Sequence, residues 1–546
     1  MCEQSFCIQF IGPYFFNKIT LKKEEITRQK IFLAALSGLL LTLSFPKTGF
    51  FWLSWFALVP LLVAVSNLSA RNGFYLGFCA GLTHYLTLIY WLAHTMKTYG
   101  HLPLFLCLAV LFLFSAYLAL YIAAFSLTVS RLCTTPVLCL VLVPCLWVLL
   151  EYVRSFLFTG FPWELIGYTQ FQVLPIIQLS DIFGVYGVSF CIVLGNASIL
   201  LLVLFLTGKR WQSKKVAKNL VTGSLATFIL IFGLVWLYGT WRIRSIDDIA
   251  SASPSARITI VQGNIAQSIK WDPAFQHDST LKYIELSLRA KHLKPDLVVW
   301  PETATPFYFL HNTTLSQMVQ QGIRNSGADF LIGSPSFRSA NNRIEYYNSA
   351  YLIDAKGNVN GRYDKAHLVP FGEYIPFKDW LPFVGKIVEG VGDFRPGNEG
   401  STISWRNFNL GVQICYEIIF PSLSRRMVNN DAALLVNITN DAWYGRSGAP
   451  YQHFSMAIFR AVENRRSLIR SANTGISGFI DPAGRVVAAT ALFEDATLTQ
   501  TVPLLDEKTC YTRFGDLFVM VCLIATVAAA LIPFLRPLNL KRGRTG

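Results

Sequence analysis

Apolar residues form long unbroken runs in one part of the chain and short, interrupted runs in another. Between residues 31 and 240 there are seven apolar runs of about 16 to 27 residues, the length that a helix needs to cross a hydrocarbon core of about 30 Å. The seven runs lie at about 31–46, 49–66, 73–93, 103–129, 136–153, 187–207 and 220–239. An eighth run covers 517–535. The pattern predicts a polytopic α-helical membrane domain with eight transmembrane helices.

The stretch between the seventh and eighth runs has the pattern of a water-soluble domain. We expect strands at the short β-branched runs 257–262, 296–300, 329–333, 349–353, 410–414 and 432–437, and helices at about 273–292, 313–326 and 450–466. Such alternation predicts an α/β layered domain. The expected organisation is a leader at 1–30, a seven-helix domain at 31–240, the α/β domain at 241–515, the eighth helix at 516–536 and a basic tail at 537–546.

Composition excludes several classes of protein. Of the 546 residues, 53% are apolar and 14% are charged, whereas soluble domains carry about 25% charged residues. A disordered chain, a collagen and a coiled coil are all incompatible with these values. The net charge of +15 leaves two interpretations, a basic nucleic-acid-binding surface or a membrane protein whose cations collect on one side.

The positions of the cations decide between these two. With the N-terminus placed inside, sixteen Lys and Arg residues fall in the inner segments, and the short outer loops hold only Lys47, Lys97 and Arg154. Cations of short loops are retained on the cytoplasmic side. We therefore expect both termini in the cytoplasm and the 241–515 domain in the periplasm of a bacterium. That domain keeps 28 Lys and Arg against 26 Asp and Glu, so no nucleic-acid partner is expected.

Three reactive residue types stand where predicted strands end. Glu302 follows the run DLVVWP, Lys365 stands in RYDKAHLVPFGE, and Cys415 ends LGVQIC. Functional residues of α/β folds gather beyond the carboxyl ends of strands. A carboxylate in apolar surroundings suits a general base, and a cation suits a developing oxyanion.

Cys415 precedes a helical pattern, where a nearby lysine is expected to lower the thiol pKa and produce a thiolate nucleophile. Taken singly, each of these residues has a simpler explanation: Glu302 as a helix cap, Lys365 as a solvated charge and Cys415 as part of the core. A base, a cation and a nucleophile at three strand ends together favour covalent catalysis.

The segments around these residues resemble a known family. WPETATPF, YDKAHLVPFGEYIPF and ICYEIIFP are similar to the Glu-Lys-Cys triad segments of the nitrilase superfamily. The further segments that resemble its membrane branch, the apolipoprotein N-acyltransferases, lie at 147–163, 184–190, 261–273, 437–445 and 460–484. The resemblance implies an αββα sandwich for the 241–515 domain. Glu164, after GFPW, departs from the apolar residue expected there.

The resemblance also implies an activity. Such enzymes transfer an acyl chain from a membrane phospholipid to the α-amino group of the diacylglyceryl-cysteine that begins a lipoprotein. It makes Cys415 the nucleophile that carries a thioester, Glu302 the general base and acid, and Lys365 the oxyanion partner. A supporting set is implied as well: Glu373 to orient the site, and Trp271, Tyr416 and Glu417 to shape the acyl pocket and support turnover. No cofactor and no metal is required, and a monomer in the inner membrane is expected.

Two other functions stay open from the residues alone. The same triad can serve a membrane-tethered amidase or nitrilase-type hydrolase in which water is the acceptor. A transporter or receptor with an accidental triad is the third possibility, against which stands the scarcity of ionisable residues in the spans apart from His84, since ion pathways carry several.

Two apolar segments and one charge cluster complete the expectations. The aromatic segments 306–310 and 373–394 predict a lid that enters the membrane interface; the alternative is an apolar loop folded over the core of the domain itself. Arg154, with Glu151 and Glu164, is expected in an outer loop, either against a lipid headgroup or in an ion pair.

Overall fold

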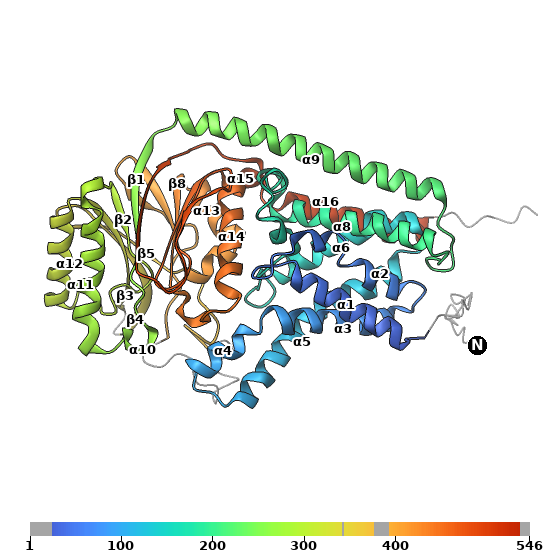
Figure 1. Ribbon diagram of the computed structural model, residues 1–546, viewed down its shortest axis with the longest axis horizontal. Coiled ribbons are helices and arrows are strands. Elements are labelled where there is room, and N and C mark those ends of the chain that lie inside the picture. The colour runs from blue at the N-terminus through green and yellow to red at the C-terminus, as the bar shows by residue number, and fades with distance from the viewer. Residues whose placement is uncertain (1–24, 341–342, 376–392, 536–546) are drawn as a thin grey trace, which may run out of the picture.

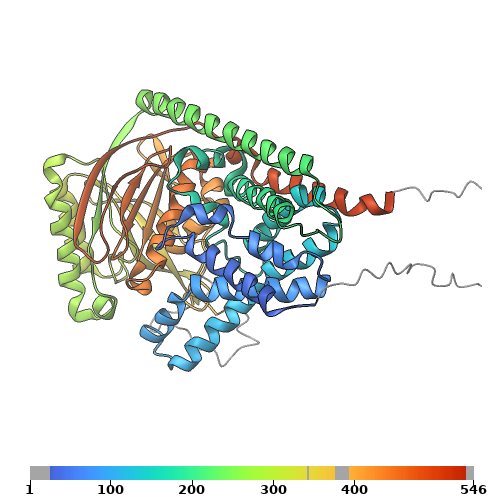
Figure 2. The same cartoon turned by 45° about the vertical axis from the view of Figure 1, so that its right-hand side comes forward.

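The protein has two parts that lie side by side, a bundle of helices and a sandwich of two β-sheets (Figure 1). The computed structural model describes residues 25–340, 343–375 and 393–535. We call residues 25–252 together with α16 (Leu517–Leu535) the helical unit, and residues 253–516 the sandwich domain. The first described turn of α1 (Arg28–Leu43) and the end of α16 both lie at the end of the helical unit farthest from the sheets (Figures 1 and 2).

The helices of the helical unit follow the apolar runs of the sequence. Besides α1 and α16 they are α2 (Val59–Val65), α3 (Ala70–Leu88), α4 (Trp91–Thr98), α5 (Leu104–Leu132), α6 (Pro136–Arg154), α7 (Leu174–Ile177), α8 (Ser180–Leu206) and α9 (Lys218–Ala252), with 3-10 turns η1 (Phe51–Trp55) and η2 (Ile166–Gln170). Local chemistry sets some of these ends. The Thr135 hydroxyl accepts the N–H of Leu138 and Pro136 occupies the first turn of α6, both of which favour a helix start.

Among the described helices, four are long and apolar enough to cross a membrane: α5, α6, α8 and α9. The pair α3 and α4 makes a fifth if the two helices, bent by 50°, form one span. Helix α1, the segment Phe51–Val65 and the apolar part of α16 are shorter, so eight spans stay a prediction. The run 49–66 is not one helix, because η1 ends at Trp55 and α2 starts separately at Val59. Pro60 lies in the first turn of α2, the part of a helix that tolerates proline.

The sandwich domain contains two six-stranded sheets, ordered β12-β1-β2-β3-β4-β5 and β11-β10-β9-β8-β7-β6. The strands are β1 (Ser255–Gln262), β2 (Leu297–Val299), β3 (Asp329–Ala340), β4 (Arg343–Ile353), β5 (Val359–Asp364), β6 (Ile403–Trp405), β7 (Phe408–Ile414), β8 (Ala432–Thr439), β9 (Ser467–Ala472), β10 (Gly478–Ile480), β11 (Val486–Ala489) and β12 (Ala496–Pro503). Strands β1, β2 and β3 run parallel, as do β7, β8 and β9. All six expected strands are present, with β2 reduced to three residues.

Helices cover both outer faces of the sandwich. On one side lie α11 (Pro273–Arg289) and α12 (Thr313–Ser326), and on the other α13 (Pro421–Asn429) and α14 (Ala449–Asn464) (Figure 1). The order of layers is the expected αββα. Helix α14 faces the helical unit (Figure 1), near the short α15 (Cys510–Phe514) that leads into α16.

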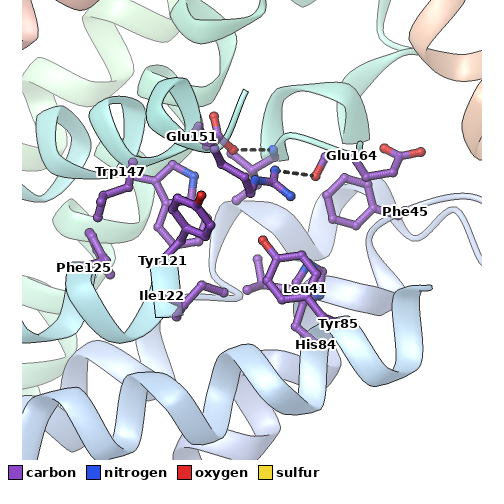
Figure 3. A pocket seen from close by; sticks show the side chains of 13 residues that line it. Leu41, Phe45, His84, Tyr85, Tyr121, Ile122, Phe125, Trp147, Glu151 and Glu164 are labelled. Atoms are coloured by element: carbon purple, nitrogen blue, oxygen red, sulfur yellow. Dashed lines mark hydrogen bonds between the residues drawn. The ribbon is translucent and has the colours of Figure 1, made fainter. Parts of the chain in front are cut away.

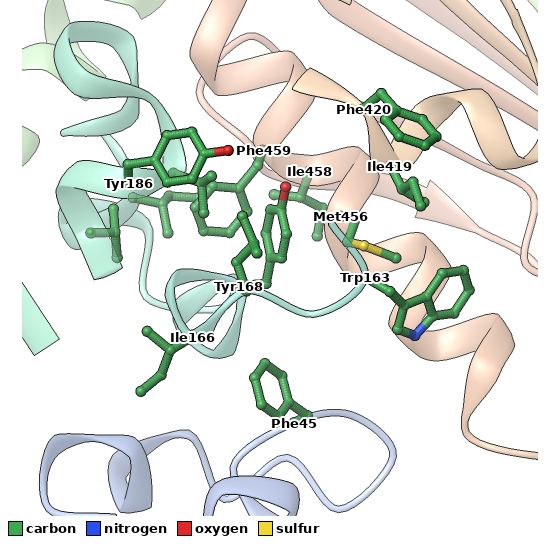
Figure 4. Close-up of a cluster of buried hydrophobic side chains, with 14 of the residues drawn as sticks. Phe45, Trp163, Ile166, Tyr168, Tyr186, Ile419, Phe420, Met456, Ile458 and Phe459 are labelled. Carbon is green, nitrogen blue, oxygen red and sulfur yellow. The ribbon is translucent and has the colours of Figure 1, made fainter. Parts of the chain in front are cut away.

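The two parts share one continuous hydrophobic core. At their boundary the ring of Tyr168, from η2, lies 4.9 Å from that of Phe459, from α14 (Figure 4). At the same boundary, Asp181 at the start of α8 forms an ion pair with Arg465, which follows α14, at 2.7 Å. Burial of apolar area against a common core holds the sandwich domain in a fixed place on the helical unit.

Candidate active site

Three strands from the two sheets deliver the predicted triad to one buried place. Glu302 follows β2, Lys365 follows β5, and Cys415 follows β7 and begins the 3-10 turn η4 (Cys415–Ile419). All three side chains are buried. The charges of Glu302 and Lys365 both act on the pKa of Cys415, so the three groups lie within electrostatic reach of one another.

Lys365 stands between two carboxylates. Its Nζ lies 2.9 Å from Oε2 of Glu373 and 3.8 Å from Oε1 of Glu302. Burial opposes the charged form of Lys365, but Glu373 and then Glu302 outweigh burial and raise its pKa above the ordinary value. The lysine is therefore a permanent cation inside the protein.

One amide orients both carboxylates. Nδ2 of Asn348, in β4, donates to Oε1 of Glu302 at 2.8 Å and to Oε1 of Glu373 at 2.9 Å. The second oxygen of Glu302 accepts the backbone N–H of Asn440 at 2.9 Å. Sequence reasoning missed Asn348; the only signal is a polar residue that opens the apolar run NSAYLI.

Cys415 occupies a strained turn and is a poor acid. Its φ of +54° lies in the left-handed region that residues other than glycine seldom adopt. Burial raises the pKa of the thiol above its ordinary value, Glu302 and Asp441 raise it further, and Lys365 lowers it only in part. The expectation of a lowered pKa is wrong, because η4 has only five residues and burial with nearby carboxylates outweighs one lysine. The resting group is a thiol.

A buried polar cluster forms hydrogen bonds to the main chain of Cys415. The Cys415 carbonyl accepts Nε2–H of His453 at 3.2 Å and Nδ2–H of Asn437 at 3.4 Å. Nδ1 of His453 faces Arg470 at 2.9 Å, and Arg470 pairs with Asp441 at 2.7 Å. Sequence reasoning missed this cluster, since no local pattern distinguishes a buried Arg–Asp pair from two surface charges.

Glu417 ties the cysteine turn to the lysine segment. Its carboxylate accepts the backbone N–H groups of Ile414, Ala366 and His367 at 2.7, 2.7 and 2.9 Å, and the hydroxyl of Tyr363 at 2.9 Å. Ala366 and His367 follow Lys365 directly, and Ile414 precedes Cys415. The side chain is fully buried, and these bonds fix the two segments relative to one another.

The two predicted aromatic residues differ in exposure. Tyr416 is buried; its hydroxyl reaches the carbonyl of Gly160 at 3.4 Å, in the loop after α6, and its ring lies 5.2 Å from Phe420. Trp271 is 36% exposed and directly follows the one-turn helix α10 (Gln267–Lys270).

A large cleft opens beside the lysine segment, between the helical unit and the sandwich domain. Its volume is about 960 Å³, and Ala366, His367 and Leu368 line it next to Lys365. The loop after α6 supplies four further lining residues, of which Phe156 and Phe158 are exposed aromatic side chains. A cleft of this size accepts a large ligand, and its rim at the helical unit is aromatic.

Comparisons with known proteins decide the family. The apolipoprotein N-acyltransferase N-terminal domain matches residues 37–198, and the carbon-nitrogen hydrolase domain matches residues 257–509. A protein of Geobacter metallireducens named apolipoprotein N-acyltransferase is 42% identical over 94% of this chain and 97% of its own length. This chain belongs to the apolipoprotein N-acyltransferase family. A protein of the same name from Pasteurella multocida is 31% identical over 91% of this chain and 94% of its own length.

Among solved structures, an amidase from Nesterenkonia sp. is similar to 49% of this chain and 95% of its own, with 19% identity and a TM-score of 0.34. The two family models and the curated relatives, by contrast, show that the chain is an acyltransferase with a nitrilase-like carbon-nitrogen hydrolase domain and an apolar helical region. This excludes the transporter and receptor alternative.

In this acyltransferase the segment 306–310 is not a membrane-entering loop. Phe307 and Phe309 are buried in the sandwich domain, and the ring of Phe309 lies 5.7 Å from that of Tyr351; only Leu310 is well exposed. The alternative, an apolar loop folded over the domain's own core, is confirmed for this segment. Most of the second predicted lid segment, residues 376–392, lies outside the described residues.

The charge cluster of the acyltransferase's α6 lies inside the protein. Helix α6 continues through Glu151 and Arg154, which are buried, as is Glu164. Arg154 donates to the carbonyl oxygens of Trp163 at 3.1 Å and Glu164 at 3.4 Å. Glu151 and Glu164 line the same small cavity (Figure 3). The cavity that they line holds about 30 Å³, enough for water but not for a lipid headgroup. The headgroup contact is therefore wrong. Glu151 and Arg154 belong to α6 rather than to a loop, and they line this cavity together with side chains of α1, α3 and α5 in the helical unit.

Proposed function

We propose that this chain is an apolipoprotein N-acyltransferase that moves a fatty acyl chain from a membrane phospholipid to the α-amino group of the N-terminal diacylglyceryl-cysteine of a lipoprotein. The observation that carries the proposal is the buried Cys415 thiol beside Glu302 and Lys365, next to a cleft of about 960 Å³ between the helical unit and the sandwich domain. A lipid donor and a lipid-modified acceptor both reside in a membrane, which accounts for a site at this boundary.

In the first half-reaction Glu302 takes the proton of Cys415 as the sulfur attacks the ester carbonyl carbon of the phospholipid. The carbon–sulfur bond forms, and the carbonyl electron pair moves to oxygen, where the Lys365 cation stabilises it. When the carbonyl re-forms, the ester C–O bond breaks, and Glu302 returns its proton to the departing lysophospholipid alkoxide. A thioester on Cys415 remains. Because burial raises the pKa of Cys415, a base that acts during attack is needed.

In the second half-reaction the α-amino nitrogen of the acceptor attacks the thioester carbon. Glu302 takes a proton from this nitrogen, the new oxyanion again meets Lys365, and the sulfur departs and receives that proton. An amide and the resting thiol result. Two half-reactions that share one covalent intermediate give ping-pong kinetics.

The remaining predicted residues act around this triad. Glu373 holds Lys365 in place through the contact at 2.9 Å. Tyr416 and the partly exposed Trp271 form walls for the acyl chain. Glu417, through its bonds to Ile414 and Ala366, keeps the nucleophile and the cation at a constant separation and so supports turnover.

The membrane arrangement extends this proposal. Residues 31–240 and 516–536 supply eight transmembrane helices in the bacterial inner membrane, and residues 241–515 form the periplasmic catalytic domain. The leader 1–30 and the tail 537–546 are cytoplasmic, and the protein acts as a monomer. The asymmetry of Lys and Arg between the inner and outer loops supports this orientation, as does the common position of the start of α1 and the end of α16 (Figure 2).

Trapping the intermediate tests the proposal. The purified protein, incubated with phosphatidylethanolamine in detergent micelles and no acceptor, is expected to gain the mass of one acyl chain on Cys415 and to lose it when a diacylglyceryl-cysteine peptide is added. Cys415→Ala is expected to show no adduct while its elution from gel filtration stays that of the wild type. Rapid release of free fatty acid with no amide product would instead support the hydrolase alternative.

A further inference from the structure

A second buried lysine lies at the active site beside the triad. Lys270, the last residue of α10, is 2% exposed. Its Nζ donates to the backbone carbonyl of Glu302 at 3.0 Å. Glu302 and Cys415 are the two titratable groups whose charges act on it. Neither half-reaction of the acyl transfer gives this cation a role.

The same short helix holds Glu302 by a second route. Oε1 of Gln267, one turn before Lys270, accepts Nδ2–H of Asn440 at 2.7 Å, and the backbone N–H of Asn440 donates to Oε2 of Glu302 at 2.9 Å. Asn473 fixes Asn440 in turn, through a bond to its Oδ1 at 3.0 Å. Helix α10 thus controls both the main chain and one carboxylate oxygen of Glu302.

A neutral donor would hold a carbonyl at lower cost than a buried ammonium group. Desolvating a cation is costly unless it is compensated, and here burial lowers the pKa of Lys270 to about 8, against the influence of Glu302 and Cys415. Below that pH the group keeps its charge. A cation retained at such cost has an electrostatic effect that an amide would not provide.

We propose that Lys270 is a positioning residue for the acylation step: its ammonium group fixes the main chain of Glu302 and adds a second positive charge, besides Lys365, while negative charge passes through the sulfur of Cys415 to the carbonyl oxygen. This inference rests on the proposed function. Lys270 then contributes to the rate of acylation in two ways, through its hydrogen bond to Glu302 and through its positive charge. Different substitutions remove these two contributions.

Two variants distinguish the contributions. Lys270→Gln keeps a donor for the Glu302 carbonyl but has no charge, and Lys270→Met removes both. The matched control is Lys282→Met, on α11, which removes only a partly exposed ion pair with Asp495. The measurement is the single-turnover rate of thioester formation on Cys415 with phosphatidylethanolamine in detergent micelles, followed by intact-protein mass from about pH 6 to pH 9. The acceptor amine is absent from this assay, and the ethanolamine amine of the donor is the same for all variants, so its titration cancels when their pH profiles are compared.

The wild-type rate is expected to fall as the pH rises through about 8, where Lys270 loses its proton. Lys270→Gln is expected to be slower by about 10-fold at neutral pH and to lack this fall, and Lys270→Met to be slower by about 100-fold, since misplacing a reacting group costs that much. Lys282→Met is expected to match the wild type throughout.

Each outcome decides one point. A Lys270→Gln variant with the wild-type rate and the wild-type fall above pH 8 would overturn the role of the charge. A folded Lys270→Met variant with the wild-type rate would overturn the positioning role, and if this variant does not fold, the pH profile of Lys270→Gln still tests the proposal. A wild-type protein that forms no thioester with phospholipid would refute the proposed function itself.

Discussion

Gln452 and His453 are adjacent on α14 and bond to opposite parts of the protein. Both polar atoms of the Gln452 amide bond to the helical unit. Its Oε1 accepts from Nε1 of Trp91 at 3.2 Å and from Nε1 of Trp163 at 2.9 Å. Its Nε2 donates to the carbonyls of Pro46 at 3.1 Å and Leu88 at 3.4 Å. His453 donates to the carbonyl of Cys415 at 3.2 Å. One helix therefore connects the helical unit to the main chain of the nucleophile.

Removing the Gln452 amide is expected to affect stability and catalysis together. Gln452→Ala leaves two buried indole N–H groups and two carbonyls without their partner, which costs about 2 to 4 kcal/mol of unfolding free energy, and it loosens the helix that carries His453. A lower thermal unfolding midpoint in detergent and slower thioester formation should both be seen. The exposed Gln321→Ala is the control and should change the stability by less than about 0.5 kcal/mol. An unchanged midpoint in Gln452→Ala would show that this amide does not join the two parts.

The shared amide of Asn348 gives a second prediction. Asn348→Ala removes the donor to both Glu302 and Glu373, so Glu302 is no longer held for proton transfer, and kcat is expected to fall by about 10- to 100-fold. Asn348→Asp should be more harmful, because a third carboxylate then faces two others. Steady-state N-acylation of a diacylglyceryl peptide measures kcat, with the exposed Asn325→Ala as control. If Asn348→Asp retained more activity than Asn348→Ala, the site would not depend on a donor here.

His367 makes stability depend on pH on the acid side. Burial lowers the pKa of His367 to about 4, and the charge of Lys365 lowers it too, whereas an unfolded histidine titrates near about 6.5. Below about pH 6.5, His367 binds a proton in the unfolded chain but not in the folded protein. The contribution of His367 to the free energy of unfolding is therefore fully present above about pH 6.5 and is lost towards pH 4, by up to about 3 kcal/mol. Thermal midpoints at about pH 7, 5.5 and 4.5 measure this loss.

His367→Gln should lose less stability than the wild type over the same range, because glutamine does not titrate. Other groups contribute equally to both proteins, so the difference isolates His367. Parallel curves for the two proteins would mean that folding does not shift the pKa of His367.

Local patterns were sufficient where apolar residues fill most of an element. The strand β8 (Ala432–Thr439) and the helix α5 were predicted to within three residues at each end, since each contains a long apolar run. The strand β9 was missed because Arg470 interrupts its apolar run. Its partner Asp441 is distant in sequence, so only the folded structure shows why a charge is tolerated there.

The residues of the candidate site divide in the same way, into those that a local sequence pattern indicates and those that only the folded structure shows. Glu302, Lys365 and Cys415 were found because each ends a strand and has a reactive side chain. Asn348 and Lys270 were missed, because an amide and a second lysine acquire their importance only through contacts that other strands create. The pKa of Cys415 was predicted in the wrong direction for the same reason, since its burial comes from packing that no local segment encodes.

The last prediction concerns the joint between the two parts. Oδ2 of Asp181, at the start of α8, accepts from Nε of Arg242 at 2.9 Å and Nη2 of Arg465 at 2.7 Å, and its Oδ1 accepts the hydroxyl of Tyr238 at 2.7 Å. Asp181→Asn removes the negative charge and leaves a buried arginine without its carboxylate, which costs about 3 to 5 kcal/mol.

A lower unfolding midpoint and faster proteolysis between the two parts are expected for this variant. The exposed pair of Asp247 and Arg485 supplies the control, since Asp247→Asn should cost no more than about 1 kcal/mol. Equal losses in the two variants would mean that the Asp181 charge is no more important than a surface ion pair, and that the apolar boundary around Tyr168 and Phe459 alone holds the sandwich domain on the helical unit.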